Sequence, residues 1–167
     1  MIAVRRIAGD EGPLLRRMRM ASLGESPHTF ATTFAQAEQL TDEQWAAVAS
    51  AHATGDDQAS FVAQIGDEVV GIVGAYLTGN LVLTMVGLWA SPGHRDNGVG
   101  KALLDEVLRF ADAVGAVQVR SWLVEPNDAA RSFYEEHGFL PTGATIPWEP
   151  DPRFSQIELV LLLPSDA

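Results

Sequence analysis

The sequence predicts a single α/β domain, residues 1–167, in which a mixed, mostly antiparallel sheet carries helices on both faces. In the first half, two β-rich runs flank the short turn Gly66-Asp67-Glu68, as in an antiparallel hairpin. In the second half, strand and helix patterns alternate, and a right-handed β-α-β crossover gives a parallel pair. The 167 residues are 47% hydrophobic and 20% charged, which is typical of a globular chain able to bury a core.

Hydrophobic spacing and turn residues define the expected elements. Thr41 and Gln44 have capping-box spacing before a helix, and Gly115 follows the amphipathic segment 98–114 as a C-terminal glycine does. In chain order we expect strands at 2–7, 60–65, 69–77, 81–90, 116–124, 139–144 and 157–163, and helices at 12–23, 42–53, 98–114 and 127–137. The stretch 26–39 is expected to be an irregular or partly helical connection, and 146–153 a proline-rich one.

Composition restricts the function. The chain has no cysteine, which excludes a disulfide framework and a covalent acyl-cysteine intermediate. A net charge of −11 argues against a nucleic-acid partner, because phosphate binding needs a basic face. The acidity suits a cationic substrate such as an amine, or solubility alone. No membrane-length apolar run, signal-peptide core or metal-ligand spacing is present, so we expect a cytoplasmic protein without membrane contact or metal.

The segment from Gly93 to Ala111 joins a polar, glycine-bearing loop to an amphipathic helix, and three phosphate-binding turns resemble it. The dinucleotide fingerprint G-x-G-x-x-G fails because its third glycine falls on Leu103. The P-loop G-x-x-x-x-G-K-[ST] fails because Arg95 and Ala102 replace its first glycine and its hydroxyl residue. What remains is R-x-x-G-x-G, from Arg95 to Gly100.

That pattern has a physical rationale as a pyrophosphate site without metal. Gly98 and Gly100 allow the backbone to approach a ligand, and the first N–H groups of the helix have no internal acceptor. The positive end of the helix dipole and the charges of Arg95 and Lys101 favour an anion there. A plain helix start after a flexible loop is the alternative.

Two motifs in this order resemble the GNAT superfamily of N-acetyltransferases. The stretch LWASPGHRDNGVGKALL is similar to motif A, R/Q-x-x-G-x-G/A, and VEPNDAARSFYEEHGF is similar to motif B, N-x-x-A-x-x-x-Y-x-x-x-G-F. The resemblance covers residues 60–139 strongly and implies acetyl-CoA as cofactor. It also implies a sheet whose parallel strand pair splays apart to admit the pantetheine arm.

The resemblance further implies roles for particular residues. Tyr134 matches the general acid that protonates the departing thiolate, although packing between helix and sheet would also explain a tyrosine there. Asn127 matches a residue that contacts CoA and also stands at a helix N-cap. The residues expected to bind the cofactor are Leu88, Trp89, Ala90, Arg95, Asp96, Asn97, Gly98, Val99, Gly100, Lys101, Asn127 and Ala130.

The implied reaction is direct acetyl transfer to a primary amine, with a small-molecule acceptor expected; a sensor or scaffold that binds acyl-CoA without turnover is the alternative. The strand before motif A has no carboxylate, so the general base is water or one of Glu25, His28 and Glu149. The expected acceptor walls are Phe30, Phe34, Trp148 and Phe154. The apolar run 157–163 is either the edge of a homodimer or a strand buried in its own sheet.

Overall fold

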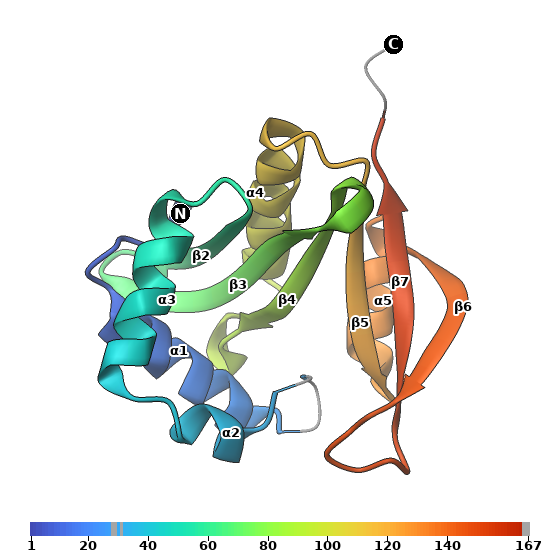
Figure 1. Cartoon of the computed structure of the whole chain (residues 1–167), viewed down its shortest axis with the longest axis horizontal. Helices are drawn as coiled ribbons and strands as arrows, with labels where there is room; N and C mark the ends of the chain where they lie inside the picture. The colour runs from blue at the N-terminus through green and yellow to red at the C-terminus, as the bar shows by residue number, and fades with distance from the viewer. Residues whose placement is uncertain (28–29, 31, 165–167) are drawn as a thin grey trace.

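The computed structural model describes residues 1–27, 30 and 32–164. Its seven strands form one sheet in the order β1-β2-β3-β4-β5-β7-β6 (Figure 1). The strands are β1 (Ile2–Arg6), β2 (Gln58–Ile65), β3 (Glu68–Thr78), β4 (Val82–Ala90), β5 (Gln118–Glu125), β6 (Leu140–Pro147) and β7 (Ser155–Leu162). The helices are α1 (Gly12–Glu25), α2 (Phe34–Glu38), α3 (Asp42–Thr54), α4 (Val99–Ala113) and α5 (Asp128–Glu136), with 3-10 turns at Gly79–Leu81 and Pro92–His94.

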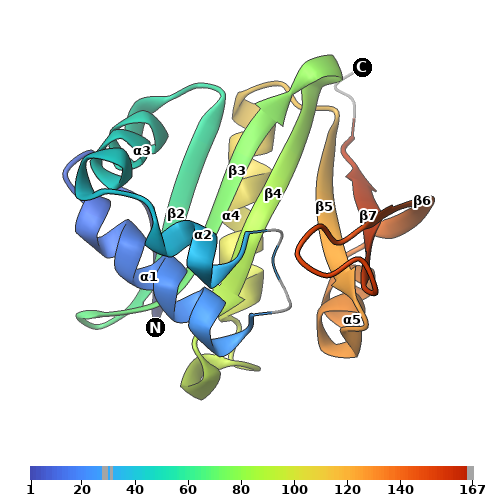
Figure 2. The ribbon, with the colours of Figure 1, turned by 60° about the horizontal axis from the view of Figure 1, so that its bottom comes forward.

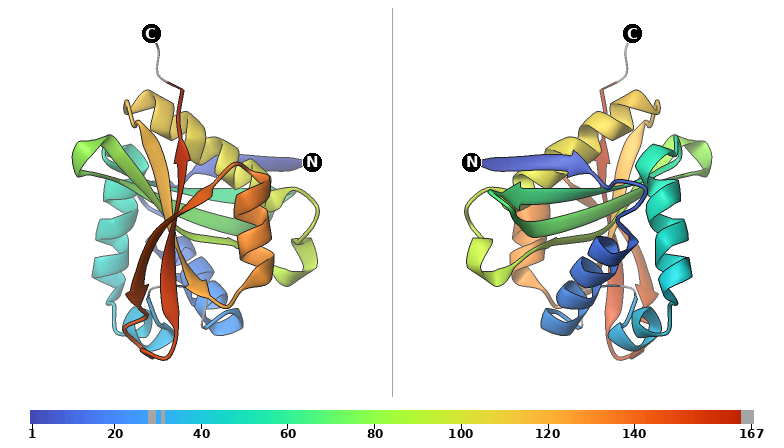
Figure 3. Two further views of the ribbon diagram at one scale, coloured as in Figure 1. Left: turned by 90° about the vertical axis from the view of Figure 1, so that its right-hand side faces the viewer. Right: turned by 90° about the vertical axis from the view of Figure 1, so that its left-hand side faces the viewer.

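Helices cover both faces of the sheet (Figures 2 and 3). On one face, Leu103, Val107 and Phe110 of α4 join Tyr134 and Phe139 in a core against the inward side chains of β2 to β5 and β7. On the other face, residues of α1 and α3 pack on β2 to β4 in a second core. The predicted mixed sheet with helices on both faces is therefore confirmed.

The parallel pair diverges, and this divergence creates the site. β4 and β5 pair in parallel only from Val82 to Thr84, opposite Gln118 to Arg120. Beyond these residues the two strands separate (Figure 2), and every other strand pair is antiparallel. A bulge at Gly87, whose φ is +62°, shifts the β3–β4 register within the separated part. The carboxyl-terminal half of β4 therefore has no hydrogen-bonded strand on its β5 side.

The connection 26–39 contains the short helix α2, which Thr33 and Gln36 start with a capping box, in agreement with the partly helical connection expected there. Two other expectations need correction. β6 continues to Pro147, three residues further than predicted, as the outer strand beside β7. Of the two interpretations of 157–163, the strand within its own sheet is confirmed and the edge strand is wrong, because β7 lies between β5 and β6. In the described parts of the chain, no helix has the length and apolarity needed to cross a membrane.

Candidate functional site

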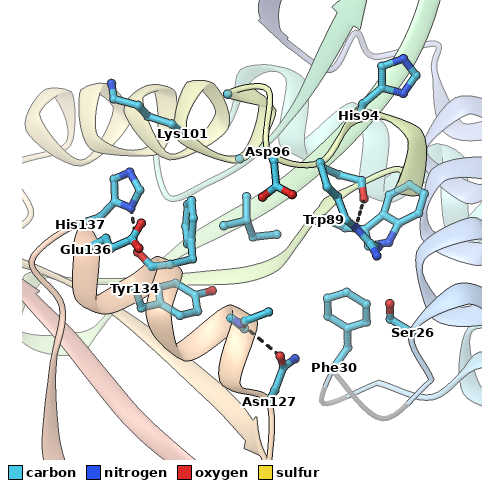
Figure 4. Close-up of a pocket in the computed structure, with 18 residues that line it drawn as sticks. Ser26, Phe30, Trp89, His94, Asp96, Lys101, Asn127, Tyr134, Glu136 and His137 are labelled. Atoms are coloured by element: carbon cyan, nitrogen blue, oxygen red, sulfur yellow. Dashed lines mark hydrogen bonds between the residues drawn. The ribbon is translucent and has the colours of Figure 1, made fainter.

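A cavity of about 580 Å³, here called the first cavity, opens between the end of β4, the start of α4 and one face of α5 (Figure 4). It brings together most of the residues that the two motifs predicted. Its lining includes Tyr134 and the expected cofactor residues Leu88, Trp89, Ala90, Arg95, Asp96, Gly98, Gly100, Lys101, Asn127 and Ala130. Asn97 does not line it, and the side chain of Val99 is buried in the core.

The amino-terminal end of α4 lies at this cavity. Gly98 is the N-cap, with φ of +93°, a conformation that glycine adopts without the cost of a Cβ. The preceding Asp96 also has positive φ, at +64°. No side chain caps the helix, and its first internal hydrogen bond runs from the Ala102 N–H to the Gly98 carbonyl. The N–H groups before Ala102 are consequently available to an anion at the positive end of the helix dipole.

Gly100 sets the distance between α4 and α5. A Cβ at this position would lie 3.2 Å from the Cε2 atom of Phe133. That contact is tighter than an ordinary van der Waals contact, so a larger side chain would press on the aromatic ring. The second glycine of R-x-x-G-x-G therefore keeps the two cavity walls close without collision.

Arg95 spans the cavity mouth to reach α1. One guanidinium nitrogen lies 2.7 Å from the Glu25 carboxylate, and its Nε donates to the Ala90 carbonyl at 3.1 Å. The same Glu25 oxygen accepts from the Trp89 indole at 3.0 Å and from the Ser26 hydroxyl. The Arg95 guanidinium, aided by the other two donors and opposed by burial, lowers the pKa of Glu25 to about 2. Glu25 is therefore a poor candidate for the general base.

Two further predicted residues have local partners. Lys101 extends from α4 away from the centre of the cavity and pairs with Asp105 at 3.0 Å, one turn later (Figure 4). Asn127 is the N-cap of α5, where its side-chain oxygen accepts from the Ala130 N–H at 3.1 Å. Asn127 therefore caps α5 and also lines the first cavity, so it can have both of its expected roles.

Tyr134 is buried on α5 and directs its hydroxyl into the cavity (Figure 4). Phe133 and Phe139 hold its ring through edge contacts, with centroids 5.6 and 5.2 Å away. The buried Ser121 hydroxyl donates to the Tyr134 oxygen at 3.0 Å. Burial raises the pKa of Tyr134 above its usual value near 10, although the Ser121 hydrogen bond lowers it in part. The phenol therefore keeps its proton at neutral pH.

A second cavity, of about 250 Å³, occupies the gap between the diverging halves of β4 and β5. It shares four lining residues with the first cavity, namely Phe30, Leu88, Ala130 and Tyr134. The Tyr134 side chain consequently stands where the two spaces meet. A hydroxyl at such a junction can reach molecules held in either space.

The residues expected to wall the acceptor site lie mostly outside both cavities. Phe30 lines both cavities, but Phe34, Trp148 and Phe154 line neither. Trp148 is buried and its indole donates to the Phe30 carbonyl at 3.1 Å, so it supports the wall from behind. Glu149 is exposed and lines neither cavity. His28 lies outside the described residues.

Several residues of the first cavity were not predicted. They are Ser26, His94, Ala129, Phe133, Glu136 and His137. Helical spacing from Tyr134 would have found part of this set, because Ala130, Phe133 and His137 lie three or four positions apart on one face of α5. Ser26 and His94 come from loops whose approach to α5 no sequence pattern indicated. Within the described ranges, no three His, Cys, Asp or Glu side chains gather as metal ligands.

Three solved structures share this fold. The yncA protein of Salmonella typhimurium, in a structure with its cofactor acetyl-CoA, aligns with 100% of this chain and 96% of its own at 14% identity and a TM-score of 0.79. An acetyltransferase of the GNAT family from Streptococcus pneumoniae aligns over 98% and 100% at 18% identity, with a TM-score of 0.75. The PaiA N-acetyltransferase of Thermoplasma acidophilum, in complex with coenzyme A, aligns over 95% and 98% at 16% identity, with a TM-score of 0.72.

The sequence itself also has a family match. A search of curated protein sequences gives no match. The model of the acetyltransferase (GNAT) family matches residues 20–139, a range that contains the R-x-x-G-x-G loop, Tyr134 and the diverging strands. This range is well over half of the chain, and so the chain belongs to the GNAT acetyltransferase family.

Proposed function

We propose that this protein transfers the acetyl group of acetyl-CoA directly to a primary amine of a small molecule. One observation carries the proposal: the protonated Tyr134 hydroxyl lies at the junction of two cavities. The first cavity ends at an anion-binding helix terminus, and the second opens in the strand gap. A donor and an acceptor can therefore approach one acid group from opposite sides.

The residues of the first cavity fit a CoA thioester. The free N–H groups at the start of α4, with Arg95 beside them, suit the pyrophosphate. The half of β4 that does not pair with β5 offers backbone groups at Leu88, Trp89 and Ala90 to an extended, amide-containing arm. Arg95 would exchange its ion pair with Glu25 for the pyrophosphate. Such an exchange is inexpensive because exposed ion pairs contribute little.

The chemistry needs an acid and the removal of one proton. Acetyl-CoA supplies the acyl thioester: the amine nitrogen bonds to the carbonyl carbon, the C–S bond breaks and the sulfur leaves with its electron pair. Tyr134 gives its proton to that sulfur. The Ser121 hydroxyl keeps the phenol oriented because it donates to the phenolic oxygen and leaves the phenolic proton for the leaving group.

Water is the proposed acceptor of the amine proton. Glu25 and Glu149 line neither cavity, and the Glu25 carboxylate also accepts a hydrogen bond from the Trp89 indole. Proton loss from nitrogen to solvent and proton gain by sulfur from Tyr134 leave the phenolate to be reprotonated. No covalent enzyme intermediate is required, in keeping with a chain that has no cysteine.

The test is release of CoA thiol from acetyl-CoA, measured with and without a broad mixture of primary amines. Mass spectrometry would show the product 42 Da heavier than its parent amine, the mass that any acetylation adds. Amine-dependent release with such a product supports the proposal. Binding of acetyl-CoA without release in any mixture would contradict it and favour the sensor function.

A further inference from the structure

The second cavity has an unusual chemical lining for a site that takes an amine. None of its described lining residues is Asp, Glu, Lys, Arg or His. Its polar side chains are neutral, from Tyr76, Thr84, Ser121, Gln156 and Tyr134, and the rest of the lining is largely aromatic or aliphatic. A cation that enters this space loses hydration and gains no carboxylate in return.

Two arginines, one from β5 and one from α1, donate to β4 residues that line this cavity. Arg120 donates to the Thr84 hydroxyl at 2.9 and 3.2 Å and also pairs with Glu158 at 3.6 Å. Arg19, from α1, donates to the Gly87 carbonyl at 3.2 Å. Arg19 forms no ion pair with any carboxylate of the described residues. Glu158 offsets the charge of Arg120, so Arg19 is the arginine without a carboxylate partner beside β4, and neither guanidinium group lines the cavity.

We infer that the acceptor is a monoamine on an aromatic or aliphatic body with no second charge, and that polyamines and aminoglycosides are excluded. This inference rests on the proposed acetyl transfer and assigns its substrate class. Burial of the apolar part of such an amine against these walls stabilises the complex by about 25 cal/mol per Å² of buried surface. A second ammonium group or a carboxylate would lose hydration in this cavity, and no charged side chain in the lining would replace it.

The same lining prepares the reacting nitrogen. The attacking amine must be neutral, and an apolar environment without a counter-charge lowers the pKa of an ammonium group. Although the net charge is −11, no acidic side chain of the described residues lines this cavity, and the neighbouring Glu158 is paired with Arg120. A volume of about 250 Å³ also falls below the range of about 300–1,000 Å³ that accommodates drug-sized ligands. A small amine therefore fits better than an aminoglycoside.

Paired acceptors of matched length provide the test. Hexylamine and 1,6-diaminohexane differ by one terminal ammonium group, and heptylamine and 7-aminoheptanoate differ by one terminal carboxylate that lies too far from the amine to change its pKa much. We expect kcat/KM to be at least about tenfold higher for the uncharged-end member of each pair, a difference of about 1.4 kcal/mol. Equal or reversed preference would overturn the inference while leaving acetyl transfer established. Failure of all four amines and of the broad mixture would overturn the proposed function as well.

A charge-reversal variant separates cavity chemistry from size. Val86 lines the second cavity and is 37% exposed, so Val86→Glu places a solvated carboxylate there without burying it. We expect the preference for hexylamine over 1,6-diaminohexane to fall by about tenfold or more in this variant. The matched control is Leu162→Glu, at a position 73% exposed and outside both cavities, and it should keep the wild-type preference. An unchanged ratio in Val86→Glu would overturn the inference.

Discussion

The Ser121 hydroxyl donates a 3.0 Å hydrogen bond to the phenolic oxygen of Tyr134, and both side chains are buried. The direction of this hydrogen bond matters because Ser121 is the donor, and the phenolic O–H of Tyr134 can therefore donate to another acceptor. Ser121 lies on β5 and Tyr134 on α5, so the packing of α5 against β5 fixes the orientation of the Tyr134 hydroxyl. Ser121 is thus a positioning residue for Tyr134.

Ser121→Ala should lower kcat by about tenfold or less, because it removes the orienting donor and retains the acid. The affinity for acetyl-CoA, measured by calorimetry, should stay as in the wild type, since Ser121 does not line the first cavity. Ser121→Thr, which keeps a hydroxyl, should recover most of the activity. A normal rate in Ser121→Ala would show that Tyr134 needs no such orientation.

The pH dependence of kcat should reflect the raised pKa of Tyr134. Burial keeps the phenol protonated beyond its usual range near 10, and the acid form therefore persists throughout neutral and mildly alkaline pH. We expect kcat to show no descending limb below about pH 10 that depends on Tyr134. A limb near pH 8 that disappears in Tyr134→Phe would mean that the phenol ionises earlier than its burial indicates.

The two glycines of the loop should be required for acetyl-CoA binding. At Gly98, φ of +93° makes any β-branched residue strained, and at Gly100 a side chain would press on Phe133. Gly98→Val and Gly100→Val should each weaken acetyl-CoA binding by about 100-fold or more in calorimetry, because the helix end moves away from its productive position.

Gly93 provides the matched control for these two variants. Nothing lies within 4 Å of a Cβ built at this position, and its φ is not in the left-handed region. Gly93→Val should therefore bind acetyl-CoA like the wild type. Near-normal affinity in both Gly98→Val and Gly100→Val would remove the helix terminus from the account of cofactor binding.

Glu25→Gln should slightly strengthen acetyl-CoA binding. The Glu25 carboxylate competes with the pyrophosphate for Arg95, and an exposed pair of this kind is worth about 0.2–1 kcal/mol. Removing the Glu25 charge should raise the affinity for acetyl-CoA by up to about fivefold. It should not change the fall of kcat at acidic pH. Loss of this acidic fall together with a large decrease in kcat would identify Glu25 as the general base.

The sequence predicted those parts of the site that lie close together along the chain. The loop from Arg95 to Gly100 encodes its own helix start, because two glycines and a following apolar stripe are local signals. The capping box of α2, Thr33 with Gln36, has the same spacing as Thr41 with Gln44, so that helix was also detectable. Such helix starts can be predicted from the sequence because the residues that interact lie within one helical turn of each other.

Contacts between distant segments could not be predicted. Glu25 and Arg95 are 70 positions apart, and only the packing of α1 against the end of β4 brings them together. The apolar composition of 157–163 fitted both an edge strand and a strand within the sheet, because the insertion of β7 between β5 and β6 depends on topology rather than on hydrophobicity. The arginines that donate to Thr84 and Gly87 belong to β5 and α1, respectively, and their approach to the second cavity could not be predicted for the same reason.

The most direct measurement of the central claim is the turnover of Tyr134→Phe beside its affinity for acetyl-CoA. Thiol release with an accepted amine and calorimetric binding would be measured for this variant, for the wild type and for the double variant Ser121→Ala/Tyr134→Phe, which leaves no serine hydroxyl unpaired. The account predicts that kcat falls by about 100-fold or more in both variants while the dissociation constant for acetyl-CoA changes less than about threefold. Wild-type turnover in the double variant would contradict the acid role of Tyr134.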